Sequence, residues 1–246
     1  MYNPQDSINV AYTHIRNLRA GGHSYGGYPV YNVTKDDLAA LKKITDKYGI
    51  PFEWMINLIN FESGRTFNPA IQNSIGATGL IQFMGSTATG LGTTTDALRK
   101  MTFKQQLVYL DKYLYSALKR HLTLLGTIPG DFTQGDLFMT IFYPVSVGKP
   151  DYVFPENVQR ANAGIAKPQD YTKKALNTAV FPLSTVPYSL PEFQKKFGGV
   201  GGIAEKSVAF VKHNTALFVI GLLLIITAIL LFVFRKKASA YVVSAT

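Results

Sequence analysis

The sequence predicts a mainly α protein, in which one helical domain is followed by a linker and a single C-terminal transmembrane helix. Three observations support this. Apolar residues recur at helical spacing through much of the first 180 residues, with little β alternation. Residues 181–214 contain many prolines and glycines, as linkers do. Residues 215–234 form a continuous, mostly apolar run without a charge.

The composition limits the classes of protein that the chain can belong to. It has 246 residues, of which 47% are hydrophobic, so it can bury a core and is not intrinsically disordered. It has no Cys, which excludes disulfides, thiolate catalysis and Cys-ligated metals. Its net charge of +10 favours an anionic partner, which could be nucleic acid, lipid headgroups or an acidic cell-wall polymer.

The N-terminal region, residues 1–34, is rich in Tyr, Gly and Asn and shows no sustained period, so we expect an extended arm there. Its first twenty residues are polar, which predicts no secretory signal. We place the helical domain at residues 35–180. Thr34 precedes two acids and is the expected N-cap of its first helix, which continues to about Tyr48.

Gly49 and Pro51 separate this helix from the next, which we expect over residues 52–63. A turn-rich stretch follows it. Two further helices are expected over residues 102–122 and 134–143.

The run at residues 215–234 has the length of a membrane span. Twenty residues at 1.5 Å each extend for about 30 Å, the thickness of the hydrocarbon core of a bilayer. A short basic tail, residues 235–246, follows it, and four lysines precede it, so the charge flanks leave the orientation open. The lipid bilayer is therefore an expected partner.

One carboxylate lies on an apolar helix face. Met55, Leu58, Ile59 and Glu62 are spaced at i, i+3, i+4 and i+7, so they share one side of the helix. Burial there would raise the pKa of Glu62, and a protonated Glu is what a glycosidase uses to donate a proton to a leaving oxygen. The alternative is a structural ion pair between Glu62 and Arg65.

The sequence around Glu62 resembles the lytic transglycosylase family. The resemblance rests on Phe61-Glu62-Ser63-Gly64-Arg65-Thr66-Phe67-Asn68-Pro69, on Gly76-Ala77-Thr78-Gly79-Leu80-Ile81-Gln82-Phe83-Met84, and on Ser86-Thr87-Ala88 with Leu91-Gly92. Ile81 replaces a Met of the family pattern and Gly85 a Pro. The family's Ala-Tyr-Asn-x-Gly motif has its nearest counterpart at Tyr143, where Pro144 replaces the Asn.

The resemblance implies a lysozyme-like helical domain that cleaves the glycan strand of peptidoglycan. Glu62 would act first as acid and then as base, closing a 1,6-anhydro ring on the muramyl sugar. Ser63, Gln82 and Tyr143 would contact the glycan or orient Glu62. Each also has a local interpretation: Ser63 as a helix cap, Gln82 facing solvent on a short helix, and Tyr143 as a core residue.

A second carboxylate would instead indicate a hydrolase of the goose-type lysozyme kind, because retaining and inverting glycosidases both use two. The first acid after Glu62 is Asp96, which could equally cap a short helix. Two other functions remain open. The chain could be an inactive wall-binding or structural membrane protein, or a membrane-disrupting protein whose span is the active part.

Other motifs in the chain are weaker. Residues 22–26 fit the G-x-S-x-G pattern of serine esterases, but no buried strand precedes them. The four histidines, at positions 14, 23, 121 and 213, have no metal-ligand spacing, so no metal or other cofactor is expected. The paired basic residues accompany no nucleic-acid motif, so no nucleic-acid partner is expected.

The sequence therefore predicts a membrane-anchored, peptidoglycan-cleaving enzyme. Two settings suit a wall-cleaving domain tethered to a membrane. One is the virion membrane of a lipid-containing bacteriophage, where the enzyme opens the wall during entry beside other virion proteins. The other is a bacterial inner membrane, with the domain facing the periplasm.

Overall fold

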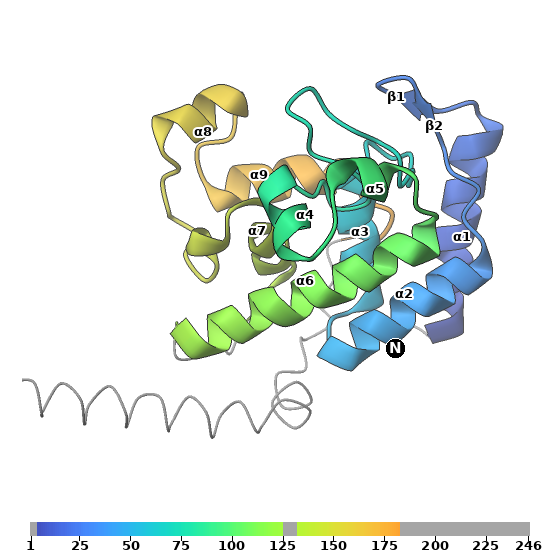
Figure 1. Cartoon of the computed structure of the whole chain (residues 1–246), viewed down its shortest axis with the longest axis horizontal. Coiled ribbons are helices and arrows are strands. Elements are labelled where there is room, and N and C mark those ends of the chain that lie inside the picture. Colours follow the sequence, from blue (N-terminus) through green and yellow to red (C-terminus); the bar gives the residue numbers. More distant parts are fainter. Residues whose placement is uncertain (1–3, 125–131, 183–246) are drawn as a thin grey trace, which may run out of the picture. The chain divides into compact units, whose positions relative to one another are not determined.

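The computed structural model describes residues 4–124 and 132–182, which form a helical domain (Figure 1). Its helices, in chain order, are α1 (Pro4–Ala20), α2 (Lys35–Tyr48), α3 (Phe52–Glu62), α4 (Gly85–Gly90), α5 (Thr95–Arg99), α6 (Phe103–Leu124), α7 (Gln134–Phe142), α8 (Glu156–Ala161) and α9 (Pro168–Leu176). A 3-10 turn, η1 (Pro144–Ser146), follows α7. Two short strands, β1 (Ser24–Tyr25) and β2 (Tyr28–Pro29), form an antiparallel hairpin. The mainly α prediction is confirmed for this part of the chain.

Helix α2 begins and ends where its sequence signals lie. The Thr34 hydroxyl accepts from the Asp37 N–H, and the Asp37 carboxylate accepts from the Thr34 N–H, which makes a capping box. Gly49 ends the helix in the left-handed conformation that glycine adopts at little cost. The predicted helices at 102–122 and 134–143 are confirmed as α6 and α7, with small differences at their ends.

The expected extended arm at residues 1–34 is wrong. Its first half is helix α1, and the hairpin of β1 and β2 follows it. Ile8, Ala11 and Ile15 are buried at i, i+3 and i+7, and α1 packs against α2 and α3. Asn9, Tyr12, Thr13 and His14 lie between these positions and dilute the apolar stripe, so the composition of the segment does not indicate a helix.

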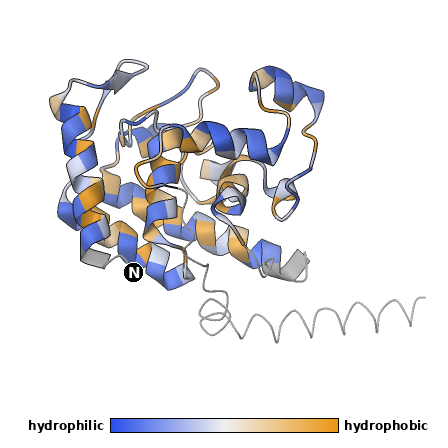
Figure 2. Ribbon diagram, turned by 180° about the vertical axis from the view of Figure 1, so that it is seen from behind, coloured by the Kyte–Doolittle hydropathy of each residue, from blue (hydrophilic) through white to orange (hydrophobic). Residues whose placement is uncertain are grey.

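Helix α3 is the central element of the domain. Eight of its eleven residues are buried, and it contacts α1, α2, α7 and α9. Figure 2 shows hydrophobic and hydrophilic bands alternating along the helices of the domain, as expected where each helix turns one side to a shared core. Helix α3 also buries two polar side chains, the amides of Asn57 and Asn60.

These two amides join α3 to the end of the domain. The Asn57 side chain accepts from the N–H groups of Val180 and Phe181, at 2.8 and 3.0 Å, and donates to the Phe181 carbonyl at 3.0 Å. The Asn60 amide donates to the Thr178 carbonyl at 2.6 Å. Phe181 is buried, so the predicted linker does not begin at residue 181 but after it.

The turn-rich segment between α3 and α4 is held by one side chain of α6. The buried Gln106 amide donates to the carbonyls of Pro69 (2.6 Å) and Leu98 (2.8 Å) and accepts from the Leu80 N–H at 3.0 Å. Gly79 leaves room for it, because a Cβ there would lie 2.4 Å from the Gln106 Oε1. In this way buried backbone N–H and C=O groups of a segment without regular structure obtain hydrogen-bond partners.

The predicted transmembrane helix (215–234), the basic tail (235–246) and all but the first residues of the predicted linker lie outside the described residues. Within residues 4–124 and 132–182, none of the helices combines the length and the apolar character needed to cross a membrane.

Candidate active site

Glu62 is the last residue of α3, and the chain beyond it turns sharply. The Gly64 N–H bonds to the Phe61 carbonyl and the Arg65 N–H to the Asn60 carbonyl, at 3.0 and 2.7 Å. This is the Schellman arrangement, with Gly64 in the left-handed conformation. Met55, Leu58 and Ile59, which share the face of Glu62, are completely buried. The helix therefore brings the Glu62 carboxyl to the edge of the core, as its spacing predicts.

The carboxyl of Glu62 is partly buried, and its surroundings favour the protonated form. Desolvation raises the pKa of Glu62 from 4.5 to about 7, while a hydrogen bond from the Tyr171 hydroxyl to Oε1 acts in the opposite direction. No neighbouring charge contributes to this shift. Glu62 can therefore hold a proton near neutral pH and still ionise when it releases that proton.

Tyr171, on α9, belongs to an aromatic cluster beside Glu62. Its ring stacks on Phe142 of α7, with centroids 4.2 Å apart, and meets Phe61 edge-on at 5.2 Å. Burial, and then the Glu62 carboxylate, raise the pKa of Tyr171 well above its usual range, so its hydroxyl stays protonated and donates. These rings provide the apolar surroundings of Glu62 and fix its partner.

Sequence reasoning missed Tyr171. It lies 109 residues from Glu62, and its hydroxyl bond depends on how α9 packs against α3. One local signal existed: Pro168 begins α9, and the Asp170 carboxylate accepts from the N–H groups of Ala166 and Lys167, which fixes the helix start. That signal predicts a helix but does not indicate what its Tyr contacts.

The alternative interpretation of Glu62 as the partner of Arg65 does not hold. Among the described residues the ion pairs are Lys42–Asp46, Lys47–Asp111 and Arg160–Glu156, and Glu62 is in none of them. The second-carboxylate alternative stays open. Asp96 is exposed in the first turn of α5, where Thr94 rather than Asp96 caps the helix.

Ser63 is placed differently from what a substrate contact requires. It is fully buried, and its hydroxyl donates to the Ile59 carbonyl at 2.6 Å and accepts from the Phe67 N–H at 2.9 Å. Both hydrogen bonds shape the turn that ends α3. In this structure Ser63 has the local capping role, and it acts on Glu62 only by holding that turn.

Gln82 lies in a turn and not on a helix. Its backbone has a left-handed φ of 55°, and its partly exposed side-chain amide donates to the Gly79 carbonyl at 3.1 Å. No hydrogen bond joins it to Glu62 in the part of the chain that the structure describes. A contact between Gln82 and the glycan stays a prediction.

Tyr143 is partly exposed and lies just beyond α7, where Pro144 begins the 3-10 turn. Its ring is 5.7 Å from Tyr152 and 5.2 Å from Phe154, and a hydrogen bond with Tyr152 is the main cause that raises its pKa. Pro144 thus ends the helix at the position where the resemblance expects an Asn. Tyr143 continues the aromatic cluster outward, while its neighbour Phe142 stacks on Tyr171.

The G-x-S-x-G segment, residues 22–26, contains β1 and the turns on either side of it. Ser24 and Tyr25 pair with Pro29 and Tyr28 in an antiparallel register. A nucleophile elbow needs a strand that leads directly into a helix, which this hairpin does not provide. The esterase interpretation is therefore excluded by the local fold.

Comparison with known proteins gives one finding. Residues 39–106 match a family model described as the transglycosylase SLT domain. Neither the curated proteins nor the solved structures give a significant match to this chain. The matched segment includes α3 with Glu62 and ends at Gln106, so it covers the candidate acid and the loop that Gln106 holds. It confirms the resemblance seen in the sequence.

Proposed function

We propose that this chain, whose residues 39–106 match the transglycosylase SLT family model, cleaves the bond between N-acetylmuramic acid and N-acetylglucosamine with Glu62 as its single acid and base. The observation that carries the proposal is the environment of Glu62. Its carboxyl is desolvated, has a pKa of about 7, and has no charged partner among the described residues. A protonated acid near neutral pH is what departure of a sugar oxygen requires.

The hydrogen bond from Tyr171 gives the two carboxyl oxygens of Glu62 different roles. Because Oε1 accepts from the Tyr171 hydroxyl, Oε2 carries the proton in the acid form. Transfer of that proton to the glycosidic oxygen lets its bond to C1 of the muramyl sugar break. The developing Glu62 carboxylate keeps the Tyr171 hydrogen bond, which stabilises its charge.

The second half of the reaction returns the proton. The Glu62 carboxylate takes the proton of the muramyl C6 hydroxyl, and O6 forms a bond to C1. The products are an anhydro-muramyl end and a free glycan end, and no water is consumed. One carboxylate therefore suffices, whereas hydrolysis with retention or inversion needs two.

The first experiment is digestion of purified sacculi by the full-length chain, with mass analysis of the released muropeptides. A Glu62→Gln variant, which keeps the acceptor for Tyr171, is the matched control. We expect products that lack one water, released only when Glu62 is present. Products with ordinary reducing ends would indicate a hydrolase. Binding to sacculi without any release by either protein would favour a wall-binding role.

We further propose that residues 215–234 anchor the domain in a membrane, which would keep the enzyme close to the wall that it cleaves. The support is the length and apolar character of that run in the sequence. The full-length chain should float with lipid vesicles and resist alkaline extraction, whereas a chain ending at residue 214 should do neither. Equal behaviour of the two chains would contradict the proposal that residues 215–234 anchor the domain.

The two proposed settings are a virion membrane of a lipid-containing bacteriophage and a bacterial inner membrane with the domain facing the periplasm. Antibodies against the domain would distinguish them, because they would label isolated virions in the first case and bacterial membranes in the second.

A further inference from the structure

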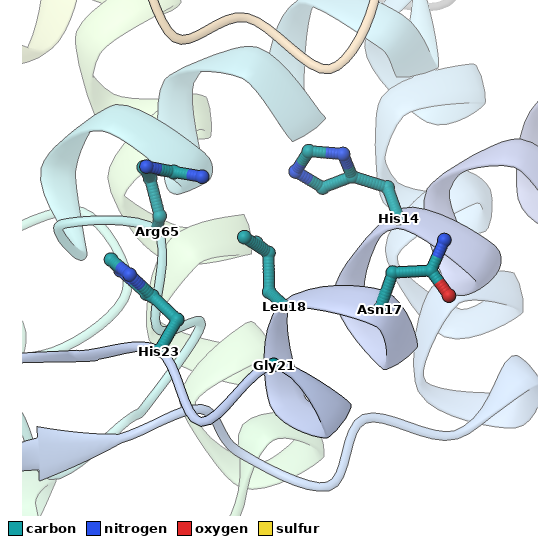
Figure 3. Close-up of a pocket in the computed structure, with 6 residues that line it drawn as sticks. All are labelled: His14, Asn17, Leu18, Gly21, His23 and Arg65. Atoms are coloured by element: carbon teal, nitrogen blue, oxygen red, sulfur yellow. The ribbon is translucent and has the colours of Figure 1, made fainter.

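A pocket of about 350 Å³ lies beside the turn that follows Glu62. Its lining residues are His14, Asn17, Leu18, Gly21, His23 and Arg65 (Figure 3). Five of these six come from α1 and the segment that joins it to the hairpin, and all five precede the segment that matches the family model. Only Arg65 belongs to that segment. The pocket is therefore formed where α1, which lies outside the matched segment, meets the end of α3.

The walls of the pocket are held together by several contacts between the hairpin region and the turn after α3. The His23 Nε2–H donates to the Gly64 carbonyl at 2.9 Å, and the Tyr31 N–H donates to the Thr66 carbonyl at 2.8 Å. The Tyr25 ring packs against Gly64 so closely that a Cβ there would lie 2.3 Å from a ring carbon. The pocket is thus formed before any ligand arrives.

The charge of the pocket suits an anion. Arg65 carries a permanent positive charge, and it takes part in none of the ion pairs found within residues 4–124 and 132–182. None of the lining residues is acidic. A guanidinium that faces a preformed pocket without a carboxylate partner is an open site for one.

The hydrogen-bonding groups around Arg65 add to this complementarity. His14 faces Arg65 across the pocket (Figure 3), and its Nε2 is buried without a hydrogen-bond partner. Desolvation, and then the charge of Arg65, lower the pKa of His14, while a side-chain hydrogen bond with Asn60 acts in the opposite direction. The neutral form of the ring has one N–H to donate. Asn17 supplies an amide, and Leu18 gives the pocket an apolar side. A carboxylate joined to a small aliphatic group matches this combination.

The position of the pocket indicates where such a carboxylate comes from. Arg65 is three residues beyond Glu62, so their Cα atoms lie within about 11 Å of each other. In peptidoglycan the muramyl sugar, whose C1 reacts at Glu62, carries a short peptide that ends in a carboxylate and contains aliphatic residues. A peptide of four residues can extend for about 14 Å, which is enough to bridge this separation.

We propose that this pocket binds a carboxylate of the peptide stem of peptidoglycan, with Arg65 as the charged contact and His14 and Asn17 as hydrogen-bonding groups. The proposal rests on the proposed function, because it takes the substrate from it. It makes the N-terminal helix, which lies outside the matched family segment, a determinant of which wall strands the enzyme recognises.

A binding experiment tests the pocket separately from the chemistry. The full-length Glu62→Gln chain is titrated with stem peptide released from sacculi by an amidase, and Kd is measured by calorimetry. We expect Arg65→Gln to weaken binding about tenfold or more and Asn17→Ala to weaken it severalfold. Amidation of the peptide carboxylates should weaken binding to the same extent as Arg65→Gln.

Arg16→Gln is the matched control. Arg16 is exposed on α1 and does not line the pocket, so this variant removes the same charge from the same region. We expect its Kd to be unchanged. Equal weakening by Arg16→Gln and Arg65→Gln would show non-specific attraction to a basic protein and would overturn the proposal. Unchanged binding in both Arg65→Gln and Asn17→Ala would also overturn it, and Asn17 is exposed, so this variant leaves the core intact.

Two further substrates identify the source of the carboxylate and distinguish failure of this proposal from failure of the proposed function. Peptide-free glycan exposes the lactyl carboxylate of the muramyl sugar. Tighter binding of N-acetylmuramic acid than of stem peptide would assign the pocket to that group and overturn the peptide assignment. Release of anhydro-muropeptides from intact sacculi by the wild-type chain tests the proposed function alone, because its failure would not alter the Kd for the peptide.

Discussion

Burial of Glu62 has two opposed effects. It keeps the carboxyl protonated near neutral pH, as catalysis requires, and it destabilises the charged form of the same group in the folded protein. Its pKa of about 7 lies above the value of 4.5 for an unperturbed Glu. The folded chain therefore binds this proton more tightly than the unfolded chain does. Stability from this group is fully present below about pH 4.5 and is lost as the pH rises through about 7.

The Glu62→Gln variant should therefore be more stable than the wild type at alkaline pH. A pKa rise from 4.5 to about 7 corresponds to roughly 3 kcal/mol of unfolding free energy, lost by the wild type across that window. The neutral Gln does not have this loss and keeps an acceptor for Tyr171. Thermal unfolding at pH 4 and pH 8 measures the difference, which should be small at pH 4 and largest at pH 8. A pH-independent difference would mean that Glu62 is not desolvated.

Tyr171 also affects the pKa of Glu62. Its hydrogen bond lowers the pKa of Glu62, so Tyr171→Phe should raise that pKa further. Because the acid form must be present, activity falls as the pH rises through this pKa, and the alkaline limb of the kcat/KM profile should move up by about one pH unit. The hydroxyl of Tyr113 donates instead to the Thr140 carbonyl, so Tyr113→Phe is the control and should leave the limb in place.

Both proposals depend on the end of α3. Glu62 is the last residue of this helix, and Arg65 is the third residue beyond it. The turn between them depends on Gly64, which has a φ of 57° and packs against Tyr25. At this position a side chain meets both backbone strain and a clash.

Gly64→Ala should lower the unfolding free energy by more than the roughly 1 kcal/mol expected for a left-handed backbone alone. Gly22→Ala is the control, since Gly22 has a φ of 69° but its Cβ would meet nothing within 4 Å. Chemical denaturation compares the two variants. Hydrogen exchange of the Tyr31 N–H, which bonds to Thr66, should accelerate in Gly64→Ala and not in Gly22→Ala. Identical behaviour would show that the contact with Tyr25 contributes nothing.

At the scale of the whole domain, segments more than a hundred residues apart meet on α3. Asn57 satisfies three backbone groups of Val180 and Phe181. Tyr171 on α9 reaches Glu62 from the same part of the chain. The active site is thus completed only when the end of the domain folds back onto α3.

Asn57→Ala should lower the unfolding free energy by roughly 3 kcal/mol, because it leaves two buried backbone groups of Phe181 and the partly buried N–H of Val180 without partners. The matched control is Asn17→Ala, which removes an exposed amide. Limited proteolysis should find new cleavage near residues 177–182 in Asn57→Ala only. The loosening should extend to α9 and reduce activity. Protection as in the wild type would show that packing, and not these hydrogen bonds, closes the domain.

The elements with strong local signals could be predicted from the sequence, and the others could not. The capping box at Thr34 and the apolar spacing in α2, α3, α6 and α7 identify those helices, because each signal is contained in one segment. Helix α1 was missed because its buried residues are separated by polar ones and depend on α2 and α3 for burial. Ser63 was ambiguous for the same reason: its pattern fits both a cap and a substrate contact, and only burial decides between them.

The sequence by itself determined that the protein is mainly helical, that Glu62 lies on an apolar face, and that residues 61–92 resemble a lytic transglycosylase. All three depend on residues close together in the chain, where the helical period fixes which side chains share a face. The tertiary structure alone decided which groups surround that face. Tyr171 as the partner of Glu62, and the pocket shared by α1 and Arg65, arise from contacts between distant segments, whose pairing the spacing of residues along one helix does not encode.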